Sequence, residues 1–446
     1  MLADTRETPH TEASNLVATS EASVLSRLEK SLWLALLALG GLALLARVLV
    51  VTTSIGSNDM ETWAGFANRI YRRGVGELYD HVRLFNHPPL MGHFAGAAYA
   101  VSKWTGIPFA WLFKTPIVLS DLGAAVLLYR GWRERGAIVA ALVFAAFCAN
   151  PVSILISAYH GNTDALCASL MLLSAVLMDR GRAFGAGLAL AASINVKLIP
   201  VILIAPIGAC VRDRKEALKY LGGLAIGALP FLPYLLWHWQ GFYEHALAYR
   251  SRPKVWGITF LSARLASAPH ISEIGTAITE FWVKRGSLAV LGWPLILAVL
   301  QRFRGPRFSA RELAAATVLG FLAFAPGFGI QYLVYPVALL FSIKLASGLW
   351  YSVIGGLHAI VMYVTLWTGT RPYFSDFLGN QGTGRQMAVL SWLISIRLLF
   401  DVVFAERSEE VREQAKFVPR ATEAWSIAPV QRVFSWIKRG SADVQQ

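Results

Sequence analysis

The sequence predicts an all-α polytopic membrane protein with about 12 transmembrane helices or half-helices and with interfacial helices in its first external loop. The first observation is composition: of 446 residues, 55% are hydrophobic and 15% are charged, and the mean hydropathy is +0.50. These values exclude an ordinary water-soluble enzyme, a disordered chain and a collagen-like fibre. The second observation is charge: the formal net charge of +14 comes mainly from basic residues in short loops between apolar runs. This distribution orients a membrane protein and does not indicate nucleic-acid binding.

The chain begins with a polar segment, 1–31, which we expect in the cytoplasm. The long polar lead and the lack of a small-residue cleavage site favour a retained signal-anchor over a cleaved signal peptide. A transmembrane domain should then extend over 32–404. Its expected spans lie near 32–52, 109–129, 137–157, 165–178, 218–237, 284–300, 312–326, 332–346, 348–367 and 387–404.

The stretch 183–211 should form a hairpin, because basic loops flank it on both sides and the chain must leave and return to the same face. We expect two short helices joined at Asn195-Val196-Lys197, with Pro200 starting the second. Each arm has about 13 residues, or about 20 Å, which is shorter than the hydrocarbon core. The joint should therefore lie at or below the outer interface.

Basic loops on one face place both termini in the cytoplasm. The opposite face then receives three longer polar segments, 53–108, 238–283 and 368–386, where a site is most readily built. The cytoplasmic tail, 405–446, has apolar residues at helical spacing beside basic ones, which favours an amphipathic helix on the inner leaflet. A regulatory or partner-binding helix is the alternative. The cysteines lack the spacing of a zinc site or a disulfide framework and are interpreted as packing residues: Cys148, Cys167 and Cys210.

Asp59 is the first candidate for chemistry. Asn58 and Glu61 have the spacing of a capping box, so a helix should start here and lie along the outer interface. Its apolar stripe should comprise Trp63, Phe66, Ala67, Ile70 and Tyr71. Asp59 is then either a first-turn carboxylate that complements the helix dipole or a general base at the membrane surface.

Two histidines follow in the predicted external turns. His87 precedes Pro88 and Pro89, which would hold its side chain in one direction, although it could be only a turn residue. His160 begins the turn His160-Gly161-Asn162-Thr163-Asp164, after a predicted helix break at Asn150-Pro151. Asn162 or Thr163 could simply cap the next helix, but a cap does not account for a histidine at the membrane edge.

Cations on the external side indicate a phosphate. A lysine such as Lys197 inside an apolar segment costs about 2.5–3.5 kcal/mol on insertion scales, so it is functional unless it can extend to the interface. The loop after Tyr249 carries Arg250, Arg252 and Lys254, where the positive-inside rule disfavours cations. These residues would bind a substrate phosphate or lipid headgroups. Asp121, inside the second span, must be paired or face a cavity.

The ordered set of these motifs resembles the GT-C superfamily of membrane glycosyltransferases, and most closely the bacterial polyprenyl-phosphate-mannose-dependent mannosyltransferases. Eukaryotic dolichol-phosphate-sugar enzymes are more distant. The motifs are Asp59, His87-Pro88-Pro89, Asn150-Pro151, His160 to Asp164, Lys197 with Pro200, and Gly329-Ile330-Gln331-Tyr332-Leu333-Val334-Tyr335-Pro336. The pattern departs from some relatives because Asn58 precedes Asp59 in place of a second acidic residue. It also fades after Pro336 and leaves the segment 368–386 without a role.

The resemblance implies a GT-C-like fold in a bacterial inner membrane and transfer of a hexose, with mannose favoured, on the outer face. The donor would be a polyprenyl-phosphate sugar, and the acceptor a hydroxyl of a lipid-linked glycan, a glycolipid or another molecule. Asp59 would be the catalytic base in an inverting reaction. Substrate would be bound by His87, His160, Asp164 and Gln331, and the donor phosphate by Lys197, Arg250 and Arg252.

No cofactor or obligatory metal is expected, since the sequence has no cluster of carboxylates. Two other classes remain as alternatives. A secondary transporter or lipid flippase is compatible with the broken hairpin and with Asp121 inside a span. A non-catalytic membrane scaffold would leave Lys197 and the external cations without an explanation.

Overall fold

The computed structural model describes residues 9–249, 251–303, 308–366 and 381–404, and the statements below concern these residues. Every named element among them is a helix, and the only β-type pairing is an isolated bridge between Pro253 and Gly327. The expected all-α fold is therefore confirmed. Arg250, the expected tail 405–446 and most of the loop 368–386 lie outside the described residues.

The first half of the chain contains the long N-terminal helix, the helices of the first loop and the hairpin. Its elements are α1 (Pro9–Thr53), α2 (Asn58–Arg73), α3 (Gly76–His81), α4 (Pro89–Thr105), α5 (Phe109–Trp132), η1 (Arg133–Arg135), α6 (Ala137–Cys148), α7 (Pro151–Ile154), η2 (Leu155–His160), α8 (Asp164–Asp179), α9 (Ala183–Val196), η3 (Ile199–Leu203) and α10 (Ile204–Gly208).

The second half adds the outer segments around 238–283 and the remaining membrane helices. Its elements are α11 (Arg214–Ala228), η4 (Leu229–Phe231), α12 (Leu232–Trp237), α13 (Trp239–Phe242), η5 (Tyr243–Leu247), α14 (Gly257–Leu265), α15 (Ser272–Phe303), α16 (Ala310–Phe324), η6 (Ile330–Val334), α17 (Tyr335–Ile343), α18 (Leu345–Leu366) and α20 (Gln381–Phe404).

Six described helices are long and apolar enough to cross a membrane, and a seventh span results if α6 and the α7–η2 segment, bent by 41°, count as one. The expected count of about 12 is not confirmed. The difference arises because several expected spans are short: α8 has 16 residues and α16 has 15. At 1.5 Å per residue they reach about 24 Å, less than the roughly 30 Å of the hydrocarbon core. The chain is an integral membrane protein.

The helices differ from the expected ones at two places. α15 begins at Ser272, inside the segment expected as the loop 238–283, and continues through the expected span 284–300. Hydropathy detects only the apolar part of such a helix. At the start of α2 the cap is Ser57, whose hydroxyl accepts a hydrogen bond from the Asp59 amide, and Asn58 is already helical. Tyr71, placed in the apolar stripe, is 56% exposed.

The hairpin forms as predicted. α9 ends at Val196, Lys197 adopts an extended backbone, and η3 begins at Ile199. α9 packs closely on α11, where a Cβ at Gly187 would lie 2.1 Å from the Tyr220 carbonyl oxygen. The predicted break at Asn150-Pro151 is also present, since α6 ends at Cys148 and α7 begins at Pro151.

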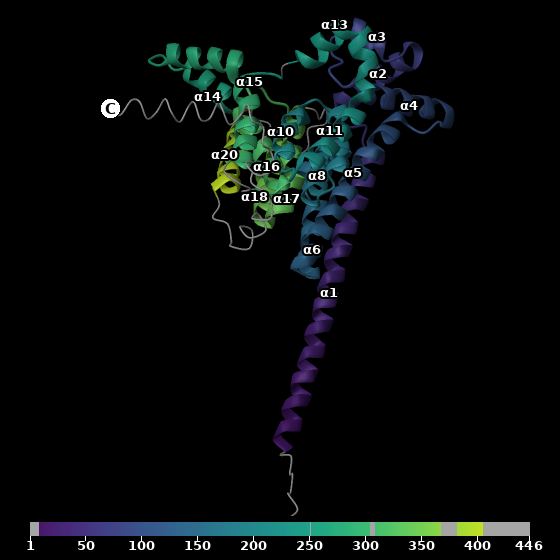
Figure 1. Cartoon of the computed structure of the whole chain (residues 1–446), viewed down its shortest axis with the longest axis vertical. Coiled ribbons are helices and arrows are strands. Elements are labelled where there is room, and N and C mark those ends of the chain that lie inside the picture. The colour runs from purple at the N-terminus through teal and green to yellow at the C-terminus, as the bar shows by residue number, and fades with distance from the viewer. Residues whose placement is uncertain (1–8, 250, 304–307, 367–380, 405–446) are drawn as a thin grey trace, which may run out of the picture.

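The helices of the segment 53–108 gather at one end of the molecule (Figure 1). α2, α3, α4 and α13 lie at this end, and the N-terminal half of α1 projects beyond the bundle at the other end. α14 and the start of α15 lie near the same end as α2 but on the opposite side of the view. The candidate site described below is built where α2 meets the bundle.

Candidate active site

Asp59 is presented by the first turn of α2. The buried face of this helix, formed by Met60, Trp63, Phe66, Ala67 and Ile70, packs against α4 and fixes the helix on the bundle. Asp59 itself points away from this face, and its side chain is 41% exposed. A carboxylate in the first turn also complements the helix dipole. The local sequence therefore delivers one accessible carboxylate at a fixed position.

His160 holds one oxygen of that carboxylate. Its Nε2 lies 2.8 Å from Asp59 Oδ2, and its Nδ1 contacts the hydroxyl of Tyr363 from α18. Asn162 Nδ2 donates a second hydrogen bond to the same Oδ2, at 3.3 Å. His160 Nε2 faces the carboxylate and donates to Asp59, whereas its Nδ1 faces the phenolic oxygen of Tyr363. Oδ2 is thus saturated, whereas Oδ1 has no hydrogen bond within the described part of the chain.

The turn that follows His160 depends on a glycine. Gly161 has a φ of +70°, and a Cβ there would lie 2.5 Å from Met60 Sδ and 2.9 Å from Lys114 Cε. Asn162 Oδ1 accepts the amide of Asp164 at 3.0 Å in an Asx-type turn, whereas the N-cap of α8 is Thr163, which makes no side-chain capping bond. The same side chain therefore closes the turn and contacts Asp59.

Lys197 supplies a cation at this site. Its Nζ lies 3.6 Å from Asp164 Oδ1, and its side chain is 12% exposed, whereas the side chain of Asp164 is fully buried. Asn195 helps fix the extended joint by donating to the Gly227 carbonyl at 2.7 Å. Asp164 is out of reach of a solvent-borne substrate, and its visible contact is with Lys197.

The electrostatics connect these groups. Burial raises the pKa of Asp59, but the hydrogen bond and charge of His160, with the charges of Lys197 and His87, outweigh burial and lower it below 3.8. The pKa of His87 lies well below its usual value, first because of burial and then because of Lys197. Asp59, His87 and Lys197 therefore lie within electrostatic reach of one another, and the Asp59 carboxylate is ionised at neutral pH.

His87 is fixed by its surroundings as the two prolines predict. Pro88 is extended and precedes α4, the Tyr79 hydroxyl donates to the His87 carbonyl at 2.6 Å, and the ring lies 4.4 Å from that of Trp63. Its Nδ1 is buried with no hydrogen-bond partner among the described residues. This nitrogen is a polar atom available to a ligand at the site.

Gln331 and Arg252 are the remaining predicted site residues that the structure describes. Gln331 is half-buried on η6, which packs against α8 and carries Tyr332, a residue within electrostatic reach of Asp164. Arg252 is exposed, and its carbonyl accepts the Phe328 amide at 3.1 Å, so its backbone is fixed while its side chain is free to turn. Arg250 lies outside the described residues.

Several contacts escape a reading of sequence alone. Tyr363 lies in an apolar helix, 203 residues from its partner His160, and no local pattern marks it. Lys114 carried the same signal as Lys197, a lysine in an apolar run; it is buried and donates to the Ser54 carbonyl at 3.0 Å. No group of three or more metal-ligating side chains occurs in the described ranges, and the prediction of no metal stays a prediction.

Comparison with known families now adds to this geometry. The sequence profile of glycosyltransferase family 87 matches residues 94–326, about half of the chain. The chain belongs to glycosyltransferase family 87. A search of curated proteins finds no significant match. The match contains His160, Asp164 and Lys197, whereas Asp59 and His87 precede it and are joined to them by the fold.

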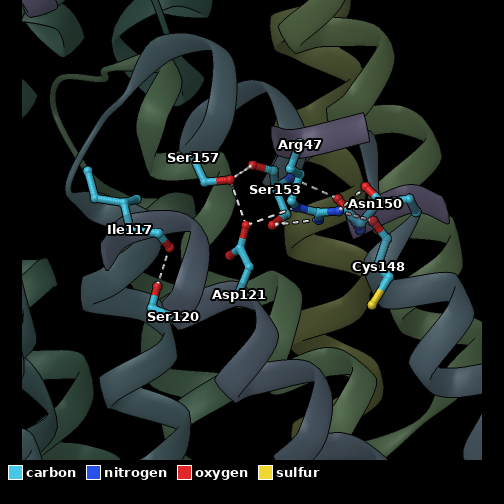
Figure 2. Close-up of polar contacts among 9 residues, drawn as sticks. Arg47, Ile117, Ser120, Asp121, Cys148, Asn150, Ser153 and Ser157 are labelled. Atoms are coloured by element: carbon cyan, nitrogen blue, oxygen red, sulfur yellow. Dashed lines mark hydrogen bonds and ion pairs between the residues drawn. The ribbon is translucent and has the colours of Figure 1, made fainter. Parts of the chain in front are cut away.

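Family 87 membership makes the protein a membrane glycosyltransferase, in agreement with the predicted resemblance to the GT-C superfamily. The alternative of a transporter or flippase loses one of its observations, because Asp121 is buried and paired with Arg47 (Figure 2). The non-catalytic scaffold is set aside because the matched family is a family of glycosyltransferases.

Proposed function

We propose that this family 87 glycosyltransferase moves a hexose, with mannose favoured, from a polyprenyl-phosphate carrier to an acceptor hydroxyl with inversion. The acceptor is a lipid-linked glycan, a glycolipid or another hydroxyl compound on the non-cytoplasmic face of a bacterial inner membrane. The observation that carries the proposal is the chain of contacts between Asp59 and Lys197. Asn162 contacts both Asp59 and the Asp164 amide, and Asp164 pairs with Lys197 at 3.6 Å. An inverting transfer needs one base and a group that stabilises a leaving phosphate.

Asp59 acts as the base in this proposal. Its Oδ2 is held by His160 and Asn162, so the exposed carboxylate can accept the acceptor's proton at Oδ1. As the acceptor oxygen bonds to the anomeric carbon, the bond from that carbon to the phosphate oxygen breaks and the proton passes to Asp59. Because the pKa of Asp59 is low, the proton moves late, when the acceptor oxygen has already become acidic through bond formation.

Lys197 stabilises the leaving polyprenyl phosphate, which departs as an anion and needs no protonation. Asp164, fully buried against Lys197, acts as a positioning residue for the ammonium. Arg252, and Arg250 from the same loop, are proposed to add charge when the donor binds. His87, through its buried Nδ1, and Gln331 are proposed to contact the sugar or phosphate.

The test is sugar transfer by Asp59→Asn in reconstituted membranes. Asparagine keeps the size of the side chain but cannot accept the proton, so we expect kcat to fall by at least about a hundredfold. Asp80→Asn is a matched control, because Asp80 also pairs with a histidine, His238 at 3.0 Å, and has no step in the proposed reaction. Equal turnover in Asp59→Asn and the parent protein would remove Asp59 from the mechanism.

A further inference from the structure

A second polar cluster lies inside the bundle, apart from the residues that face substrate (Figure 2). Arg47 of α1 is fully buried, Asp121 of α5 is 2% exposed, and Arg47 Nε lies 3.2 Å from Asp121 Oδ2. The proposed reaction has no step for either residue. An ion pair buried in the membrane domain is costly unless its remaining donors and acceptors are also satisfied. The other contacts of Arg47 and Asp121 therefore indicate what the pair does.

Arg47 satisfies the broken end of α6. Its Nη1 donates to the carbonyl of Cys148, the last residue of α6, and its Nη2 donates to Ser153 Oγ at 3.3 Å. The next helix begins with Pro151, which has no N–H to offer the preceding turn. The guanidinium therefore caps the Cys148 carbonyl, which a continuous helix would have bonded internally.

Asp121 holds the segment beyond the break. Ser157 donates to Asp121 Oδ2 at 2.6 Å, and it also lies 2.7 Å from the Ser153 carbonyl. Ser157 belongs to η2, a π-helical turn that ends at His160 three residues later. Such turns have strained hydrogen-bond geometry and often occur at functional sites. The contact with Asp121 thus fixes the turn that delivers His160 to Asp59.

A neighbouring helix contacts the same segment at both ends. Asn150, at the break, donates to Ser352 of α18, and His160, at the end of η2, contacts Tyr363 of α18. Asn150 Oδ1 also accepts the Ser153 amide at 3.0 Å. The break and the π-helical turn are therefore held between α1 and α5 on one side and α18 on the other.

We propose that Arg47, Asp121 and Ser157 form a clamp that positions His160 and thereby orients the Asp59 carboxylate. They are positioning residues, and none of them contacts substrate. This inference rests on the proposed role of Asp59 as the base. It predicts that loosening the clamp lowers turnover while substrate binding is kept, because a small displacement of a catalytic group costs rate more than affinity.

The first test is Ser157→Ala, with Thr317→Val as the matched control. Thr317 is also a buried hydroxyl that bonds the carbonyl four residues earlier, but it lies on α16. For Ser157→Ala we expect kcat to fall between about tenfold and a hundredfold, with KM for donor and acceptor within about twofold. The acid limb of the pH–rate profile should move to higher pH, since His160 would contact Asp59 less well. Unchanged kcat and acid limb, or an equal loss in Thr317→Val, would overturn the clamp.

The second test separates positioning from stability. Arg47→Met with Asp121→Leu removes both buried charges together, so the protein should fold, whereas Arg47→Met alone leaves a buried carboxylate unpaired. The folded double variant should still show a kcat loss of at least about tenfold, because Ser157 has lost the contact with Asp121 that ties η2 to α5. Parent-like kcat in the folded double variant would show that the pair serves folding alone and would overturn the proposal.

Asp59→Asn is measured beside these variants to separate the two proposals. If Asp59→Asn is inactive and both clamp variants turn over like the parent, only the clamp fails. If Asp59→Asn retains activity, the proposed function fails. The clamp is supported when Asp59→Asn is inactive and the clamp variants show the reduced kcat with unchanged KM.

Discussion

Two opposing effects act on the carboxylate of Asp59. Burial alone would raise its pKa and favour the protonated form, which cannot act as a base. The contact with His160 Nε2, with the nearby charge of Lys197, reverses the direction and keeps the carboxylate ionised at neutral pH. The price of this arrangement is a weaker base, which suits a reaction whose proton moves late.

The pH dependence of activity follows from that balance. Asp59 must be ionised to act, so activity should persist as the pH falls until it passes through the lowered pKa, below 3.8. In His160→Ala the effect of burial is no longer offset, so the acid limb of kcat/KM should move to higher pH, with greater loss at about pH 5 than at about pH 8. His238→Ala, which removes the partner of Asp80, is the control. An acid limb at the same pH in His160→Ala and the parent would contradict this account.

Lys197 should govern donor affinity. Loss of a charge-assisted contact to phosphate costs about 1.5–3 kcal/mol, so Lys197→Met should raise KM for the lipid donor by about tenfold to a hundredfold. Because this change also leaves Asp164 buried and unpaired, Lys197→Met with Asp164→Asn tests the same point without that penalty. Unchanged donor binding in the double variant would assign Lys197 to a purely structural pair with Asp164.

Among the elements, the short turn between η2 and α8 is decisive. His160 and Asn162, two residues apart in this turn, both contact Asp59. The turn needs a left-handed residue at Gly161 and a close approach of α2 and α5 from either side. Any side chain there would displace Met60, the residue after Asp59, or Lys114. The geometry of the base is thus coupled to one backbone position.

Gly161→Ala tests this coupling, with Gly106→Ala as its control. Both glycines have positive φ, +70° and +78°, so both variants carry a similar backbone strain. Only Gly161 is crowded, since no heavy atom lies within 4 Å of a Cβ at Gly106. We expect Gly161→Ala to lose at least about tenfold in kcat and to melt at a lower temperature than Gly106→Ala. Equal kcat and melting temperature in the two variants would contradict the coupling.

The sequence predicts these elements unevenly. The hairpin joint at Lys197 and the break at Pro151 are confirmed because proline, lysine and flanking charges mark them locally. The predicted cap of α2, Asn58, is wrong. Ser57 and Asn58 are both good caps, and the sequence alone does not choose between them. The start of α15 at Ser272 is not predicted, because hydropathy does not distinguish a polar helix from a loop.

The sequence marks single residues of the candidate site but does not predict the contacts between them. Asp59, His160 and Lys197 each had a local signal, a first-turn acid, a turn histidine and a lysine in an apolar run. Their pairings with each other, and with Asp164 and Tyr363, join residues on different helices and follow only from how the bundle packs. Arg47 likewise could not be assigned to Asp121 from the sequence.

At the scale of the molecule, Asp59 and the free part of α1 lie at opposite ends (Figure 1). The expected cytoplasmic loops carry basic residues, whereas Asp59 lies with α2 at the end opposite the free part of α1 (Figure 1). If the positive-inside rule orients the chain as the sequence predicts, the proposed site faces outward, where a lipid-linked sugar donor would present its headgroup. The family match and the membrane spans make the chain a membrane glycosyltransferase, and the contacts that connect Asp59 to Lys197 are consistent with the proposed reaction.

The central claim is tested most directly by offering the purified, membrane-reconstituted protein a panel of sugar donors with membrane lipid extract, and identifying the products by mass spectrometry. The account predicts that a hexose from a polyprenyl-phosphate sugar, with mannose the preferred one, appears on an acceptor while polyprenyl phosphate is released. Transfer from a nucleotide sugar, with none from any polyprenyl-phosphate sugar, would contradict it.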